Sequence, residues 1–89
     1  MAYSRICISS GHGLKVRGAS GYIDEVDEAR LVVEKLAGDL MARGVEVRTF
    51  HDNTSTTQDQ NLKTIVNWHN AQGPHDLDIS CHFTAPQSP

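Results

Sequence analysis

The sequence predicts an α/β fold with the order β-α-β-α-β, in which a mainly parallel sheet is flanked by helices. Three observations predict it: three short apolar or alternating runs, two longer segments of helical periodicity between them, and glycine or proline at most of the boundaries. Because both connections contain a helix, neighbouring strands are expected to be parallel, with right-handed crossovers. Residues 1–89 are expected to form a single domain.

The first strand is predicted over residues 5–9, a continuous run rich in apolar and β-branched residues. Such a run is typical of a central strand that is covered on both faces. The segment Ser10-Gly11-His12-Gly13 follows, and its glycines predict a sharp exit loop. The loop is expected to continue to Ile23, with Gly18 and Gly21 interrupting regular structure.

The first helix is predicted from Asp24, as the N-cap, to Gly44, as the C′ residue. Between these ends the apolar residues recur at helical spacing. They are Val26, Ala29, Val32, Val33, Leu36, Ala37 and Leu40.

The next strand and helix follow the same logic. Residues 45–50 alternate between apolar and polar types, which predicts a strand nearer an edge. After a polar loop over residues 51–57, Thr57 and Gln60 resemble a capping box. Gly73-Pro74 is expected to end the second helix. The predicted apolar stripe of this helix consists of Leu62, Ile65, Val66 and His69.

The third strand is predicted over residues 77–83, which alternate regularly. One face carries Leu77, Ile79, Cys81 and Phe83, and the other carries Asp78, Ser80 and His82. The tail from residue 84 has no pattern.

Composition excludes some classes of function. The net charge is −3 and the pI is about 5.9, and no basic stripe is present, which argues against binding nucleic acid through its phosphates. No apolar run approaches the ~18 residues of a membrane span, and no secretory signal is recognisable at the N-terminus. Cys7 and Cys81 lie in strand-like runs and are expected to be buried thiols, with a disulfide or a metal-binding pair as the alternatives.

Three side chains predict a metal site at the carboxyl ends of the strands, where open α/β sheets bind ligands. His12 follows the first strand, His82 ends the third, and Glu25 opens the first helix. Two imidazoles and one carboxylate match the His₂Glu set of catalytic zinc sites, which leave a fourth position for water. Two alternatives remain open: His12 as an ordinary polar loop residue and His82 as a hydrogen-bonded core histidine.

Glu25 is preferred to Glu28 as the carboxylate ligand because it lies on the apolar stripe of the helix. The residues four, seven and eleven positions after it are Ala29, Val32 and Leu36. The same offsets from Glu28 reach mostly charged residues, which indicates a solvated face. A buried carboxylate needs a metal or a charged partner.

The remaining histidines, Asp52 and the loop over residues 10–15 give weaker indications of a functional site. His69 is expected to pack on the helix, whereas His51 and His75 are expected to be solvated loop residues. Asp52 is a candidate for supporting the site. A phosphate-binding loop over residues 10–15 is disfavoured because it lacks the required spacing and is not followed at once by a helix.

Taken in order, these motifs resemble the zinc-dependent N-acetylmuramoyl-L-alanine amidases, in particular the catalytic domains of phage endolysins and bacterial autolysins. The resemblance covers essentially all 89 residues. It rests on Ser10-Gly11-His12-Gly13, Gly18-Ala19, Glu25, Gly44-Val45-Glu46-Val47 and the segment Asp78-Ile79-Ser80-Cys81-His82-Phe83-Thr84-Ala85.

The resemblance implies that His12, Glu25 and His82 bind Zn²⁺. It implies hydrolysis, by zinc-activated water, of the amide between N-acetylmuramic acid and the L-alanine of the peptidoglycan stem peptide. The protein is then expected to be made in the cytoplasm and to act on the cell wall after release or lysis.

Two departures from the family pattern matter. Thr84 stands where the family usually has asparagine. The family domain is also considerably longer, and its later half supplies a general-base glutamate without a counterpart here, so a truncated amidase domain is expected. Its catalytic residue is then unknown, and the alternative is a catalytically inactive zinc- or wall-binding module. An uncovered sheet edge also predicts self-association.

Overall fold

The computed structural model describes residues 4–15 and 25–82. Its elements follow the predicted order β-α-β-α-β: β1 (Arg5–Gly13), α1 (Glu25–Met41), β2 (Glu46–Asp52), α2 (Gln58–Asn70) and β3 (Leu77–Cys81). The predictions made for Gly18, Gly21, Asp24, Phe83 and Thr84 concern positions outside the described residues.

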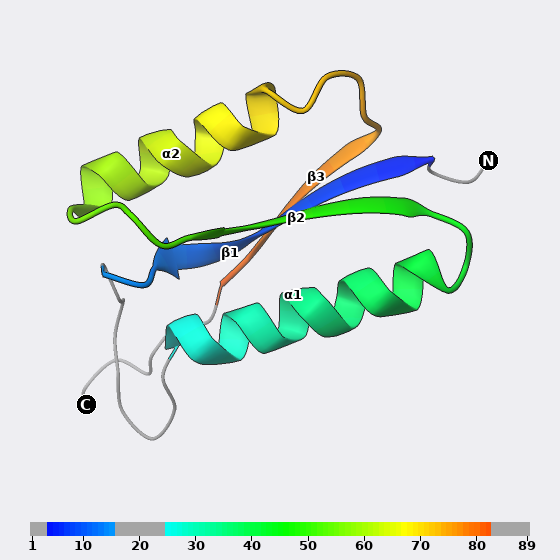
Figure 1. Cartoon of the computed structure of the whole chain (residues 1–89), viewed down its shortest axis with the longest axis horizontal. Helices are drawn as coiled ribbons and strands as arrows, with labels where there is room; N and C mark the ends of the chain where they lie inside the picture. Colours follow the sequence, from blue (N-terminus) through cyan, green and yellow to red (C-terminus); the bar gives the residue numbers. More distant parts are fainter. Residues whose placement is uncertain (1–3, 16–24, 83–89) are drawn as a thin grey trace, which may run out of the picture.

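The three strands form one parallel sheet in the order β2-β1-β3, so β1 is central and β2 lies at an edge, as predicted. The two helices cover opposite faces of this sheet, which makes a three-layer arrangement (Figure 1). The chain leaves β1 towards one side through α1 and then crosses β1 to the other side through α2. Crossovers in opposite directions keep the same hand only when their helices lie on opposite faces.

The apolar core lies between the sheet and α1. Ile6, Ile8 and Val33 are buried together there. Partly buried side chains pack around them: Leu36, Leu40, Val45, Val47, Ile79 and Cys81. The predicted apolar stripe of α1 is therefore confirmed except at Val32, which is 40% exposed.

The face of the sheet below α2 is more polar than predicted. The buried side chains of α2 are Asn61, Ile65 and His69, whereas Leu62 and Val66 are exposed. The predicted stripe of this helix is thus wrong at two positions. Asn61 and His69 can be buried because they form hydrogen bonds, Asn61 to Asp52 and His69 to the sheet.

The ends of the elements follow from local chemistry. Gly44 has a φ of 86°, its N–H donates to Met41, and the N–H of Val45 donates to Leu40. These bonds form a Schellman motif, which confirms Gly44 as the C′ residue. Thr57 is the N-cap of α2 and accepts a hydrogen bond from the backbone of Gln60.

The capping box is only half formed, because the Gln60 side chain accepts from the backbone N–H of Thr56 instead of that of Thr57. Within the described residues, no helix has the length and apolarity that crossing a membrane requires. Cys7 is buried, Cys81 is partly buried, and both are free thiols.

Candidate metal centre

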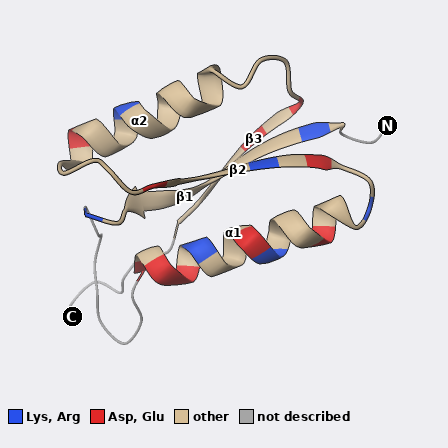
Figure 2. Ribbon diagram, viewed as in Figure 1, with Lys and Arg blue, Asp and Glu red and all other residues tan. Residues whose placement is uncertain are grey.

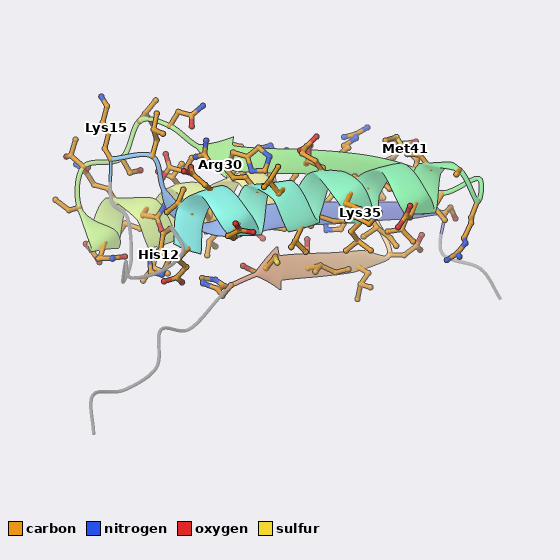
Figure 3. The ribbon with its side chains drawn as sticks, turned by 90° about the horizontal axis from the view of Figure 1, so that it is seen from below. His12, Lys15, Arg30, Lys35 and Met41 are labelled. Atoms are coloured by element: carbon orange, nitrogen blue, oxygen red, sulfur yellow. The ribbon has the colours of Figure 1, made fainter. Side chains whose placement is uncertain are left out.

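The three predicted ligands meet at the carboxyl ends of β1 and β3. One ligand atom from each of His12, Glu25 and His82 lies within 4.8 Å of the other two. This position is the topological switch point of the sheet, because the chain passes from the central strand β1 to β2 on one side and then crosses to β3 on the other. Figure 3 places His12 where α1 begins, far from Met41 at the other end of that helix.

His12 belongs to β1, which continues to Gly13 instead of ending in the predicted exit loop. The pairing with β2 shifts register between Ser9 and Gly13, so the strand is irregular at this point. His12 itself has a φ of 57°, in the left-handed region that few residues other than glycine adopt. Backbone strain of this kind is concentrated at binding and catalytic sites.

The imidazole of His12 contacts groups on both of its nitrogens. Its Nε2 lies 3.0 Å from Oε1 of Glu25. Its Nδ1 lies 3.4 Å from the side-chain amide of Gln58, at the start of α2. Gln58 therefore contacts the ring on the side opposite Glu25. Nothing in the sequence pattern pointed to Gln58.

Glu25 is 6% exposed, whereas Glu28 is only half-buried, so the predicted burial of Glu25 is confirmed. It opens α1, whose first turn carries further acidic residues (Figure 2). Acidic groups at this position are favourable because the N-terminus of a helix carries partial positive charge. A buried carboxylate in contact with imidazole is a suitable ligand for a divalent cation.

His82 directly follows β3, and its ring meets that of His12 edge to face, with centroids 5.5 Å apart. The ring also packs against the backbone of Gly11. A Cβ atom at Gly11 would overlap with the imidazole of His82. Gly11 therefore makes room for the ring of His82, whereas its sequence context indicated only a turn.

Asp52 holds the chain segment next to the centre through its backbone and is itself held by hydrogen bonds. Its backbone carbonyl accepts a hydrogen bond from Leu14, which fixes the chain just beyond His12. Its buried carboxylate accepts from the N–H groups of Thr54 and Ser55 and from the side-chain amide of Asn61. Burial opposes the charged form, but these hydrogen bonds outweigh it and lower the pKa of Asp52 to about 2.

The remaining histidines are less exposed than predicted. His51 lies in β2 between Ser10 and Glu34, with nitrogen–oxygen distances of 2.8 Å to each. The side chain of His75 is only 13% exposed. The prediction that both are solvated is therefore wrong, because His51 has partners on β1 and α1, and His75 has partners in its own loop and on β3. His69 is buried as predicted and is also hydrogen-bonded at both nitrogens.

A hollow of about 370 Å³ borders the centre between α2 and β3. His82 and Ser80 line its polar side, and apolar side chains of α2 line the other: the exposed Leu62 and Val66 and the buried Ile65. The donor set beside it fits zinc, since two imidazoles and one carboxylate are the protein ligands of many catalytic zinc sites.

Residues 6–89 match the model of a protein family described as N-acetylmuramoyl-L-alanine amidase. The matched segment includes all three candidate ligands. A comparison with curated proteins found no match.

Proposed function

Since the chain belongs to the N-acetylmuramoyl-L-alanine amidase family, we propose that it takes part in hydrolysis of the amide between N-acetylmuramic acid and the L-alanine of the stem peptide. The observation that carries the proposal is the convergence of His12, Glu25 and His82 within 4.8 Å at the switch point of the sheet. We propose that these side chains hold a zinc ion. Such an ion supplies Lewis-acid activation of water and of the scissile carbonyl.

The surrounding residues hold these three side chains in place. Gln58 contacts the imidazole of His12, and Gly11 allows the ring of His82 to approach the backbone of β1. Asp52 fixes the segment that follows His12. A site held in this way loses little free energy to reorganisation when the substrate binds.

The hollow beside His82 suits the substrate on both sides of the scissile bond. Leu62, Ile65 and Val66 provide an apolar wall. The lactyl group and the L-alanine residue each present one methyl group next to the amide. We propose that this wall contacts those methyl groups and so places the amide at His82.

The proton acceptor is the part of the mechanism that these side chains do not supply. Among residues 4–15 and 25–82, no further carboxylate joins the cluster within 4.8 Å. Glu25 is committed as a ligand, and Asp78 contacts two imidazoles and stands about 13 Å from His82 along the strand. This observation favours a second candidate function, a zinc-dependent muropeptide-binding module without turnover.

Zinc content tests the ligand assignment. The purified protein is expected to bind about one zinc ion at this centre, and His12→Ala and His82→Ala are each expected to lose it. Metal analysis by mass spectrometry measures this. Undiminished zinc in both variants would overturn the assignment.

Muropeptide cleavage distinguishes the two candidate functions. The 89-residue chain alone is expected to show no measurable cleavage, because a positioned base contributes roughly 10²–10⁴ in rate. The chain extended by the C-terminal part of a family catalytic domain is expected to release free alanine amino groups. If this extended chain binds muropeptide and does not cleave it, the binding module is the correct function.

Two further expectations belong to the proposal. We propose that the protein reaches the cell wall after release or lysis. We also propose that copies associate through β3, an edge strand whose Leu77 is 36% exposed, because unpaired edges favour strand pairing. Sedimentation of the zinc-loaded protein at increasing concentration tests this, and a concentration-independent monomer would contradict it.

A further inference from the structure

A second group of metal-binding side chains lies on the α2 face of the sheet. It consists of Cys7 on β1, His75 in the α2–β3 loop and Asp78 on β3. One ligand atom from each lies within 4.8 Å of the other two. Asp78 precedes His82 by four residues, so this group stands roughly 13 Å from the first centre at about 3.3 Å per residue. We propose that Cys7, His75 and Asp78 bind a second divalent cation of the zinc or cobalt type.

The sheet itself brings two of the three ligands together. Cys7 and Asp78 are register partners in the parallel pair β1–β3. Paired residues of neighbouring strands present their side chains to the same face, so the strand register places the thiol and the carboxylate side by side. Ile6 and Ile8 point into the core on the α1 side, which leaves Cys7 on the α2 side.

His75 is oriented as a metal-binding histidine. Its Nδ1 lies 2.7 Å from the carbonyl oxygen of Gly73, which can only accept, so Nδ1 carries the hydrogen. Its Nε2 is then the atom directed at Oδ1 of Asp78, at 2.6 Å. Metal-binding histidines typically donate one N–H to a backbone carbonyl in this way and bind the metal with the other nitrogen.

The surroundings of His75 favour a positive charge between its Nε2 and Asp78. The Gly73 carbonyl and the Asp78 carboxylate both stabilise the imidazolium and raise the pKa of His75. A divalent ion would replace the imidazolium proton between Nε2 and the carboxylate.

Asp78 has an outer partner of its own. The Nδ1 of His69 lies 2.6 Å from Oδ1 of Asp78, and the Nε2 of His69 lies 2.8 Å from the hydroxyl of Ser9. His69 is only 9% exposed, so this contact holds the carboxylate from the buried side. Ligating carboxylates in metal sites are hydrogen-bonded in the same way.

Cys7 determines which ions suit the site. Burial and the nearby Asp78 raise the pKa of its thiol, and a bound cation would favour the thiolate. A thiolate sulfur favours zinc, cobalt or cadmium over magnesium or calcium. The nearby cations Arg5 and Arg48 are both paired with Glu46, at 2.7 and 3.3 Å, which reduces their repulsion of a metal.

An ion can reach the group from solvent. His75 lines a hollow of about 340 Å³ at the amino ends of the strands, together with Arg5, Glu46 and Asp76. Asp78 lines the hollow between α2 and β3. A bound ion would tie β1, β3 and the α2–β3 loop together, so its role would be structural and independent of the proposed hydrolysis.

Cobalt titration of the chelator-treated protein tests the proposal. A thiolate bound to Co²⁺ gives an intense charge-transfer absorption in the near ultraviolet, which nitrogen and oxygen ligands alone do not give. The wild type is expected to bind a second cobalt ion that produces this absorption. Cys7→Ser is expected to abolish it, whereas Cys81→Ser, which alters the thiol on the other face, is expected to retain it.

Two further variants make the test decisive. His75→Asn changes a loop residue outside the core, and it is expected to weaken the thiolate-linked cobalt by at least about 10-fold. This variant decides the matter if circular dichroism shows that Cys7→Ser does not fold. His82→Ala is expected to keep the absorption, so failure of the first centre is distinguishable from failure of the second. No thiolate absorption in the wild type, or unchanged absorption in Cys7→Ser or His75→Asn, would overturn the proposal.

Discussion

The imidazole of His82 rests on the backbone of Gly11, and that of His12 contacts the side chain of Gln58. The precision of the candidate centre therefore depends on residues that are not ligands. The spacing of histidines and carboxylates predicts ligands, but it does not reveal which neighbours hold them. Gly11 illustrates this limit, because in the sequence it indicated only a turn, whereas in the structure it provides space for a ring.

Gly11→Ala is expected to weaken zinc binding by roughly 10- to 100-fold, a magnitude typical for loss of support around a metal ligand. The added Cβ overlaps with the ring of His82, so the ring must leave the position in which it meets His12. Competition with a chelating dye measures the zinc affinity. The matched control is Gly38→Ala, where a Cβ meets no atom within 4 Å. Equal zinc affinities in the two variants would contradict the packing role of Gly11.

Asp52 is expected to make the stability of the protein depend on acid pH. Its folded-state pKa is about 2, below the ordinary value of 3.8, so folding favours the carboxylate. The resulting stabilisation, about 2 kcal/mol, is fully present above about pH 4 and is lost as the pH falls through about 2. Asp52→Asn lacks this contribution, so its stability deficit relative to the wild type is expected to shrink with acidification.

Urea unfolding at about pH 5 and about pH 2 measures this difference. Asp39→Asn removes an exposed carboxylate from α1 and serves as the control. A deficit of the same size at both pH values would show that the Asp52 carboxylate is not selectively stabilised by folding.

Helix α2 shows how an element can be predicted correctly while its buried face is not. Periodicity and the Thr57 cap predicted the helix, and both are confirmed. The apolar pattern favoured Leu62, Ile65, Val66 and His69 as buried residues, but Leu62 and Val66 are exposed, and the polar side chains Asn61 and His69 occupy buried positions together with Ile65. They do so because hydrogen-bond partners lie opposite them on β1, β2 and β3, and no property of the helix sequence reveals those partners.

Removing the cap of α2 is expected to destabilise the protein by about 1 kcal/mol. The Thr57 hydroxyl accepts the N–H of Gln60 at 3.1 Å, and Thr57→Ala leaves that donor without its partner. Thr57→Ser retains a hydroxyl and is expected to keep most of the stability. Urea denaturation at neutral pH measures both variants. Equal loss in the two would mean that the methyl group, and not the hydrogen bond, matters.

At the scale of the whole molecule, topology explains why widely spaced residues form one centre. The order of elements and the central position of β1 could be predicted from the apolar runs and the intervening helices, and both are confirmed. The meeting of His12, Glu25 and His82 follows from the ends of β1 and β3 and the start of α1. The partners of His75 could not be predicted in this way, because its contacts with Gly73 and Asp78 depend on the path of one loop.

Because the first centre joins β1, α1 and the end of β3, its geometry exists only in the folded chain. Zinc that binds the folded chain alone must therefore stabilise it, by about 2.7 kcal/mol at a concentration 100-fold above Kd. In a chain of 89 residues this corresponds to a rise in Tm of roughly 10–20 °C.

Differential scanning calorimetry with and without zinc measures this rise. The Cys7→Ser variant is the suitable background, because an ion bound by Cys7, His75 and Asp78 then does not contribute. Adding His82→Ala to this background removes a ligand of the first centre and is expected to abolish most of the rise. Magnesium is expected to give little stabilisation in any variant, because it prefers oxygen ligands to imidazole. The same zinc-induced rise with and without His82 would show that zinc stabilises the chain at some other place.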